Sequence, residues 1–103
     1  MTEILVKFDE PIIGLKGDRY FAQALGRERD DGLWEGWLEF IPVDESGACV
    51  PSGRETTQPN HTDVKYWAQG LTRVYLQGAL TRAQSPTQAI ERDRAERAAS
   101  RNT

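Results

Sequence analysis

The sequence predicts an α+β fold: an antiparallel meander of three or four strands that packs against one long C-terminal helix. Two patterns carry this prediction. Apolar and polar residues alternate through much of the first half of the chain, which is the period of a half-buried strand, and residues 62–84 repeat apolar positions at about 100° per residue, which is the period of a helix. At 103 residues we expect one domain over residues 1–84 and a polar tail over residues 85–103.

The first predicted strand covers residues 3–8, where charged and apolar side chains alternate. Pro11 follows the end of this strand, and residues 12–18 form an apolar loop that contains two glycines. We expect Ile12 and Ile13 in this loop to pack inward over the core.

Residues 19–29 and 33–43 predict a hairpin around a three-residue turn that ends at Gly32, because glycine readily adopts the left-handed conformation that such a turn needs. A two-residue turn would place Glu28 opposite Glu35, a like-charge pair that disfavours it. The three-residue turn pairs Ala22 with Phe40, Gln23 with Glu39, Ala24 with Leu38, Leu25 with Trp37, and Arg27 with Glu35.

This register divides the side chains of the hairpin into two faces. One face carries small alanines opposite Leu38 and Phe40, which suits a sheet that packs beneath a helix. The other face carries four apolar residues with charged residues at one end, and no second helix is predicted to cover it. These four residues are Phe21, Leu25, Trp37 and Ile41.

Residues 48–58 leave two alternatives open. Residues 48–50 can begin a fourth strand, but Pro51 and Gly53 interrupt it, and residues 54–58 tolerate β-structure without offering an apolar face. The segment is either an edge strand or an ordered loop that leads into the helix.

One helix is expected over residues 62–84, with Asn60 or Thr62 as its N-cap and Ser85, which precedes a proline, at its end. Two glycines lie inside this helix, where each costs roughly 1 kcal/mol relative to alanine. We expect Gly70, on the polar side, to be tolerated within the helix.

The core-facing stripe of this helix contains Val64, Ala68, Leu71, Tyr75, Gly78 and Ala79. Gly78 on this stripe indicates that another backbone approaches closely. Leu76 and Leu80 lie away from the stripe and make the apolar arc unusually broad, so we expect them to leave a second apolar flank open.

Beyond Pro86 the composition becomes rich in alanine, arginine and glutamate. Residues 85–88 resemble a capping box, so a second helix is one alternative, but Ile90 would be its one large apolar residue. We expect a tail that is marginally helical or disordered.

Composition limits the classes of function. The chain has 13 basic and 16 acidic residues and a formal net charge of −3, which disfavours nucleic-acid binding. Cys49 is the single cysteine, residues 1–8 alternate where a signal peptide would be uniformly apolar, and no stretch approaches the ~18 apolar residues that indicate a membrane span. We therefore expect a cytoplasmic protein without membrane association.

Residues suited to catalysis are few. His61 is the only histidine and lies in a capping segment, and Cys49 has no histidine near it in sequence to activate it. Glu35 and Glu39 flank Trp37 on one strand face, a pattern that a glycosidase could use, but alternating glutamates on a solvent-facing strand are common. One histidine and one cysteine do not make a zinc site. We expect no enzyme activity, no cofactor and no metal.

Four short motifs carry a resemblance to known proteins: Trp34-Glu35-Gly36-Trp37, residues 54–60 (RETTQPN), Tyr66-Trp67 and Gly78-Ala79-Leu80. Together they resemble a set of small uncharacterised bacterial proteins over most of residues 21–80, which implies a bacterial source and no known activity. The order of strand, hairpin and helix is also similar to that of antitoxins of HicB type, and this likeness implies a small toxin as partner. HicB proteins commonly add a further strand and helix or a DNA-binding segment, and the tail of this chain has neither signature.

The sequence thus predicts a small non-catalytic interaction module that forms a homodimer or binds a protein partner. Trp37 is its expected anchor, because buried aromatic residues dominate interface energetics. Three alternatives stay open. The first is a monomer in which Ile12, Ile13 and the tail fold over the apolar patches, the second is an antitoxin-like regulator that binds a small toxin, and the third is a small-ligand-binding domain with a pocket lined by Trp34, Trp67 and Tyr75. The candidate interface residues are Phe21, Leu25, Trp37, Ile41, Leu76 and Leu80.

Overall fold

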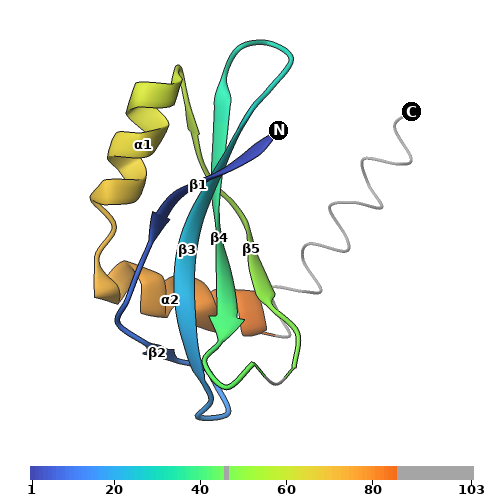
Figure 1. Cartoon of the computed structure of the whole chain (residues 1–103), viewed down its shortest axis with the longest axis vertical. Helices are drawn as coiled ribbons and strands as arrows, with labels where there is room; N and C mark the ends of the chain where they lie inside the picture. Colours follow the sequence, from blue (N-terminus) through green and yellow to red (C-terminus); the bar gives the residue numbers. More distant parts are fainter. Residues whose placement is uncertain (46, 86–103) are drawn as a thin grey trace.

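The computed structural model describes residues 1–45 and 47–85 and has an α+β fold, as predicted (Figure 1). The predicted tail lies outside the described residues, apart from Ser85. The elements in order are β1 (Thr2–Lys7), β2 (Ile12–Ile13), β3 (Arg19–Glu28), β4 (Trp34–Pro42), β5 (Val50–Gln58), α1 (His61–Gln69) and α2 (Arg73–Gln84).

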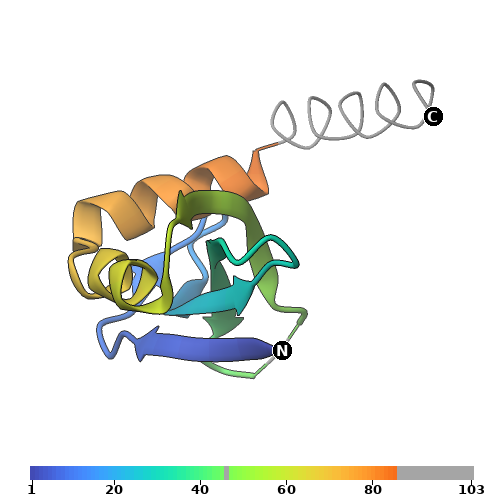
Figure 2. The same ribbon diagram turned by 90° about the horizontal axis from the view of Figure 1, so that it is seen from above.

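The strands form one antiparallel sheet in the order β1-β3-β4-β5, and the short β2 pairs with β3 beyond the end of β1. Every cross-strand pair predicted for the hairpin is present, and Gly32 has the expected left-handed conformation, with a φ of 85°. Both helices lie on the same face of the sheet (Figure 2). The largest fully buried side chains are Phe40, Ile12, Leu38, Leu80 and Val64.

The two edge strands depart from regular pairing. In β1 the register shifts between Ile4 and Val6, so the simple alternation expected for residues 3–8 does not hold through the strand. Residues 50–58 form an edge strand, which decides between the two alternatives left open by the sequence. The register of β5 shifts on both sides of Trp37, and there the hydroxyl of Ser52 accepts a hydrogen bond of 2.9 Å from the Leu38 amide.

The prediction of one long helix is wrong, because the chain forms two short helices separated at Gly70. Asn60 caps α1, and its side chain accepts a hydrogen bond from the Asp63 amide. Thr72 has an extended backbone and caps α2, where its hydroxyl accepts from the Tyr75 amide at 3.2 Å. The break is favourable for two reasons. Gly70 no longer carries the free-energy cost of a glycine inside a helix, and Thr72 accepts a hydrogen bond from an amide that the start of α2 would otherwise leave without an acceptor.

The break changes which side chains are buried. Because α1 runs along the strands and α2 crosses them, the two helices present different arcs to the sheet (Figure 1). Leu76 is 4% exposed and Leu80 is 0% exposed, so both belong to the core and the expected open flank does not exist. Ile12 packs inward as predicted, whereas Ile13 remains half-exposed.

The side chain of Gln77 on α2 holds β2 in place. Its amide group accepts a hydrogen bond from the Ile13 amide at 3.1 Å and donates one to the Ile13 carbonyl. At the end of the same helix, Gln84 accepts from the Leu15 amide at 2.9 Å and donates to the Tyr20 hydroxyl. Two side-chain amides thus connect the start of the chain to α2.

Candidate interaction surface

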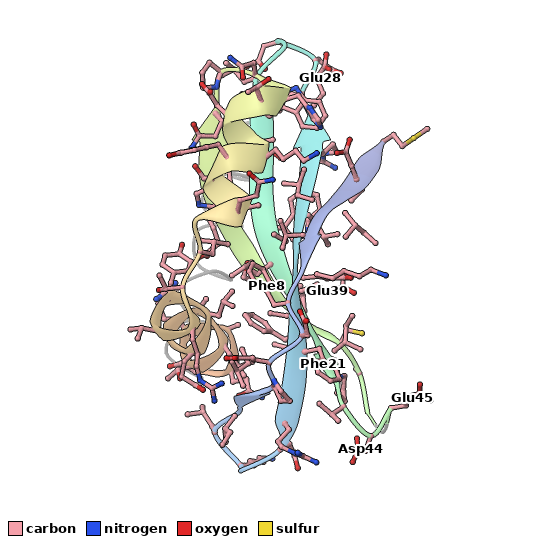
Figure 3. All side chains as sticks on the ribbon, turned by 60° about the vertical axis from the view of Figure 1, so that its left-hand side comes forward. Phe8, Phe21, Glu28, Glu39, Asp44 and Glu45 are labelled. Atoms are coloured by element: carbon pink, nitrogen blue, oxygen red, sulfur yellow. The ribbon has the colours of Figure 1, made fainter. Side chains whose placement is uncertain are left out.

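The candidate functional surface is the face of the sheet opposite the helices, which we call the open face. It is formed by residues at alternate positions of β3 and β4, from Phe21 to Arg27 and from Glu35 to Ile41, together with Ile4 of β1. Figure 3 shows Phe21 and Glu39 on the side of the strands that faces away from both helices, with Asp44 and Glu45 beyond them at one end.

The four apolar residues predicted for the open face are all there, but they differ in exposure. Leu25 is only 6% exposed even though no helix covers it, because its cross-strand neighbours Ile4 and Trp37 flank it on both sides. Phe21, Trp37 and Ile41 are half-buried. Ile4 is 49% exposed and also lies on this face, opposite Leu25. The sequence did not predict this position, because the register of β1 shifts between Ile4 and Val6.

An arginine cluster occupies the end of the open face nearest the β3–β4 turn. The carboxylate of Glu35 accepts a hydrogen bond of 3.1 Å from Arg27, and the guanidinium groups of Arg29 and Arg54 each lie 3.9 Å from it. Arg29 also pairs with Asp31 at 2.9 Å, so three guanidinium groups meet two carboxylates and one positive charge is in excess. The guanidinium of Arg27 also lies over the ring of Trp37, 5.8 Å from its centre, in cation–π contact.

The other end of the open face is largely apolar and carries one acidic and one basic side chain. A shallow hollow of about 340 Å³ is lined by Phe21, Ile41, Lys7 and Gln23, among others. Glu39 borders this end, and within the described part of the chain its carboxylate has no hydrogen bond or ion pair. The face therefore carries arginines at one end and, in the cross-strand row of Lys7, Gln23 and Glu39, one basic and one acidic side chain toward the other.

The three aromatic residues expected to line a ligand pocket each make separate contacts. The ring of Trp34 lies edge-on to His61, with centres 4.8 Å apart. The ring of Trp67 packs directly on the backbone of β4, where a Cβ added to Gly36 would lie 2.6 Å from it. These contacts fill the space between helices and sheet with side chains.

Tyr75, the third of these residues, belongs to a polar cluster between α2 and β5. Its hydroxyl donates a hydrogen bond of 2.6 Å to Glu55, which also accepts from Arg82 at 3.0 Å. Burial, reinforced by the Glu55 carboxylate, raises the pKa of Tyr75 to about 12. The cluster links two elements and has no exposed nucleophile.

The residues considered for catalysis are not brought together. His61 is the first residue of α1, and its Nε2 lies 2.8 Å from a Glu3 carboxylate oxygen of β1. Cys49 is exposed. Among the residues that the structure describes, no three His, Cys, Asp or Glu side chains are grouped so that they could hold a metal ion.

No family model, curated protein or solved structure matches this chain. The likenesses to small bacterial proteins and to HicB antitoxins therefore stay predictions. In residues 1–45 and 47–85, neither helix has the length and apolar character needed to cross a lipid bilayer.

Proposed function

We propose that this chain is a small non-catalytic interaction module that forms a homodimer through the open face. One observation carries the proposal: both helices cover the same side of the sheet, and the other side presents half-exposed aromatic and aliphatic residues around Trp37. Contiguous apolar area on an otherwise polar domain commonly marks a protein-binding surface.

Trp37 is the anchor of the proposed interface. It lies near the middle of β4, next to the buried Leu25, and Arg27 holds its ring from one side. A side chain that is already held in place loses little conformational entropy when a partner covers it, which favours binding. Tryptophan and arginine are also the residue types most enriched among interface residues that contribute strongly to affinity.

A non-catalytic role is supported by the positions of the polar residues. Glu35, which could have formed a carboxylate pair with Glu39, is surrounded by arginines, and His61 pairs with Glu3 at an unrelated position. A ligand pocket between helix and sheet has less support, because Trp67 occupies that space.

The antitoxin alternative names a different partner, a small basic protein encoded beside this chain. It rests on the likeness to HicB-type proteins described above. Co-expression of the chain with its neighbouring reading frame would test it, since a stable complex of unlike chains would support the alternative and exclude self-association as the main role.

The experiment that tests the proposal is the solution mass of the full chain by size-exclusion chromatography with light scattering, over a wide concentration range. We expect a dimer for the parent and a folded monomer for Trp37→Glu. Ile4→Lys, at an exposed position of the same face, should also weaken the dimer and guards against misfolding of the first variant. Val74→Glu is the matched control, because Val74 is 83% exposed on α2, on the helical side.

A parent chain that stays monomeric at every concentration would overturn the proposal. So would a dimer that survives Trp37→Glu and Ile4→Lys but is lost with Val74→Glu, since the interface would then lie on the helices. Circular dichroism of each variant establishes that the fold is intact.

A further inference from the structure

We infer that the open face, once a second copy covers it, binds an oxyanion of the phosphate type beside Trp37, held by the guanidinium groups of Arg54 and Arg27. This inference rests on the proposed function and names a ligand of the same surface. Its basis is the balance of charge on the open face, together with the free hydrogen-bond donors of Arg54.

The open face carries one positive charge in excess. The arginine cluster contributes this excess, and the row of Lys7 and Glu39 adds one charge of each sign. Asp44 and Glu45 lie beyond the far end of the face (Figure 3). The basic side chains are Lys7, Arg27, Arg29 and Arg54, and the acidic ones, on the face or paired with it, are Asp31, Glu35 and Glu39.

A second copy does not remove this excess, because it brings the same set of side chains. Whichever way its strands lie, an interface made of two open faces contains the excess charge of both copies. If Glu39 of one copy met Arg54 of the other, Lys7 would be left as the uncompensated charge. Covering an uncompensated charge removes its hydration and is costly, so the dimer needs an anion that neither copy supplies.

Arg54 has the donors that such an anion requires. It lies opposite Trp37 on the edge strand β5, and its side chain is 59% exposed. The Glu35 carboxylate lies 3.9 Å from its guanidinium group, which is beyond hydrogen-bonding distance. Among residues 1–45 and 47–85, no group accepts a hydrogen bond from this guanidinium, so its N–H donors are available to a ligand.

Arg27 places a second guanidinium group close to the first. It donates to one oxygen of the Glu35 carboxylate at 3.1 Å, and Arg54 lies near the other oxygen of the same carboxylate. Two guanidinium groups that share one carboxylate are close enough for a single oxyanion to contact both, and the planar fork of arginine matches the oxygens of phosphate. A multiply charged oxyanion can thus offset the excess of both copies.

The test compares sodium phosphate with sodium chloride at equal ionic strength. The dissociation constant of the dimer is measured on the full chain by light scattering on dilution. We expect phosphate at millimolar concentration to lower this constant by roughly tenfold relative to chloride. Equal ionic strength separates binding of the anion from screening of charge, which both salts provide alike.

Arg54→Gln removes both the excess charge and the free donors. This variant should form a tighter dimer than the parent in chloride, and phosphate should have no further effect on it. Lys65→Gln, at an exposed position of α1, removes a positive charge from the helical side and is the matched control. It should keep the full response to phosphate.

A dimer that Trp37→Glu dissociates but that is equally tight in both salts would overturn the anion site and leave the open face as the interface. A phosphate response that survives Arg54→Gln would also overturn the site, since the ion would then act elsewhere. A chain that stays monomeric in both salts would overturn both the anion site and the proposed function.

Discussion

At the scale of single residues, Gly36 determines how closely α1 approaches the sheet. A Cβ at this position would lie 2.6 Å from the Trp67 ring and 2.9 Å from the methyl group of Thr56, so the glycine leaves the space that the ring fills. The alternating sequence of the hairpin places this glycine on the core face of the sheet. It did not show which side chain takes that room, because the partner is more than thirty positions away in the chain.

We expect Gly36→Ala to lower the free energy of unfolding by about 1–3 kcal/mol, the usual cost of forcing extra volume into a packed core. Gly53→Ala in β5 is the matched control. A Cβ there meets no atom within 4 Å, so its free energy of unfolding should stay within about 0.5 kcal/mol of the parent. Urea denaturation measures both, and equal effects of the two substitutions would contradict the packing assigned to Trp67.

At the scale of elements, the break between α1 and α2 is the feature that sequence periodicity could not show. The apolar repeat continues through residues 62–84, and a glycine followed by a threonine is compatible with a continuous helix when only the period is considered. The hairpin was predictable down to its register, because turn chemistry and cross-strand charge pairing pointed to the same pairs. For residues 62–84 only the apolar period was used, with no second pattern to mark the break. Leu76 and Leu80 were therefore assigned to the surface instead of the core.

Thr72→Ala should cost about 1 kcal/mol of stability, because the first amides of α2 lose their side-chain acceptor. Thr62→Ala is the matched control: Thr62 is exposed inside α1 and caps nothing, so alanine there should be neutral or slightly stabilising. Urea denaturation of the two variants distinguishes them. Equal stability of both would mean that the cap contributes nothing.

The hydrogen bond from the Tyr75 hydroxyl on α2 to Glu55 on β5 should make the free energy of unfolding decrease at high pH. Because the pKa of Tyr75 is about 12 in the folded chain and 10.0 ordinarily, the folded state keeps the tyrosine proton when the unfolded state has begun to lose it. The stabilisation is complete below pH 10 and is lost as pH rises toward 12. We expect the difference in free energy of unfolding between the parent and Tyr75→Phe to shrink over this range, and a constant difference would contradict the pKa. Tyr66→Phe, at an exposed ring, controls for the substitution at neutral pH.

At the scale of the whole molecule, the sheet is covered on one side by two helices, and that asymmetry was visible in the sequence. The sequence placed Phe21, Leu25, Trp37 and Ile41 on one face, and the structure places them there. The sequence did not place Ile4 on this face, because the pairing of β1 is irregular. It also did not show that Arg29 and Arg54, from separate parts of the chain, both lie near Glu35. Whether the face binds a second copy stays a prediction.

The connection between β2 and α2 predicts a local pattern of hydrogen exchange. In Gln77→Ala the amide of Ile13 loses its acceptor and should exchange faster, whereas the Leu15 amide, held by Gln84, should remain protected. Gln69→Ala, at an exposed position of α1, is the control. Faster exchange throughout β3 and β4 would show instead that the substitution destabilises the whole domain.

That connection also bears on the order of folding. Ile13 and Gln77 are separated by 64 positions, so their hydrogen bonds close a loop that contains most of the domain. Long loops close at a greater entropic cost than the short turn of the β3–β4 hairpin, and contacts of this kind slow folding. We expect the hairpin to form early and β2 to be fixed last, when α2 docks and joins the two ends of the domain.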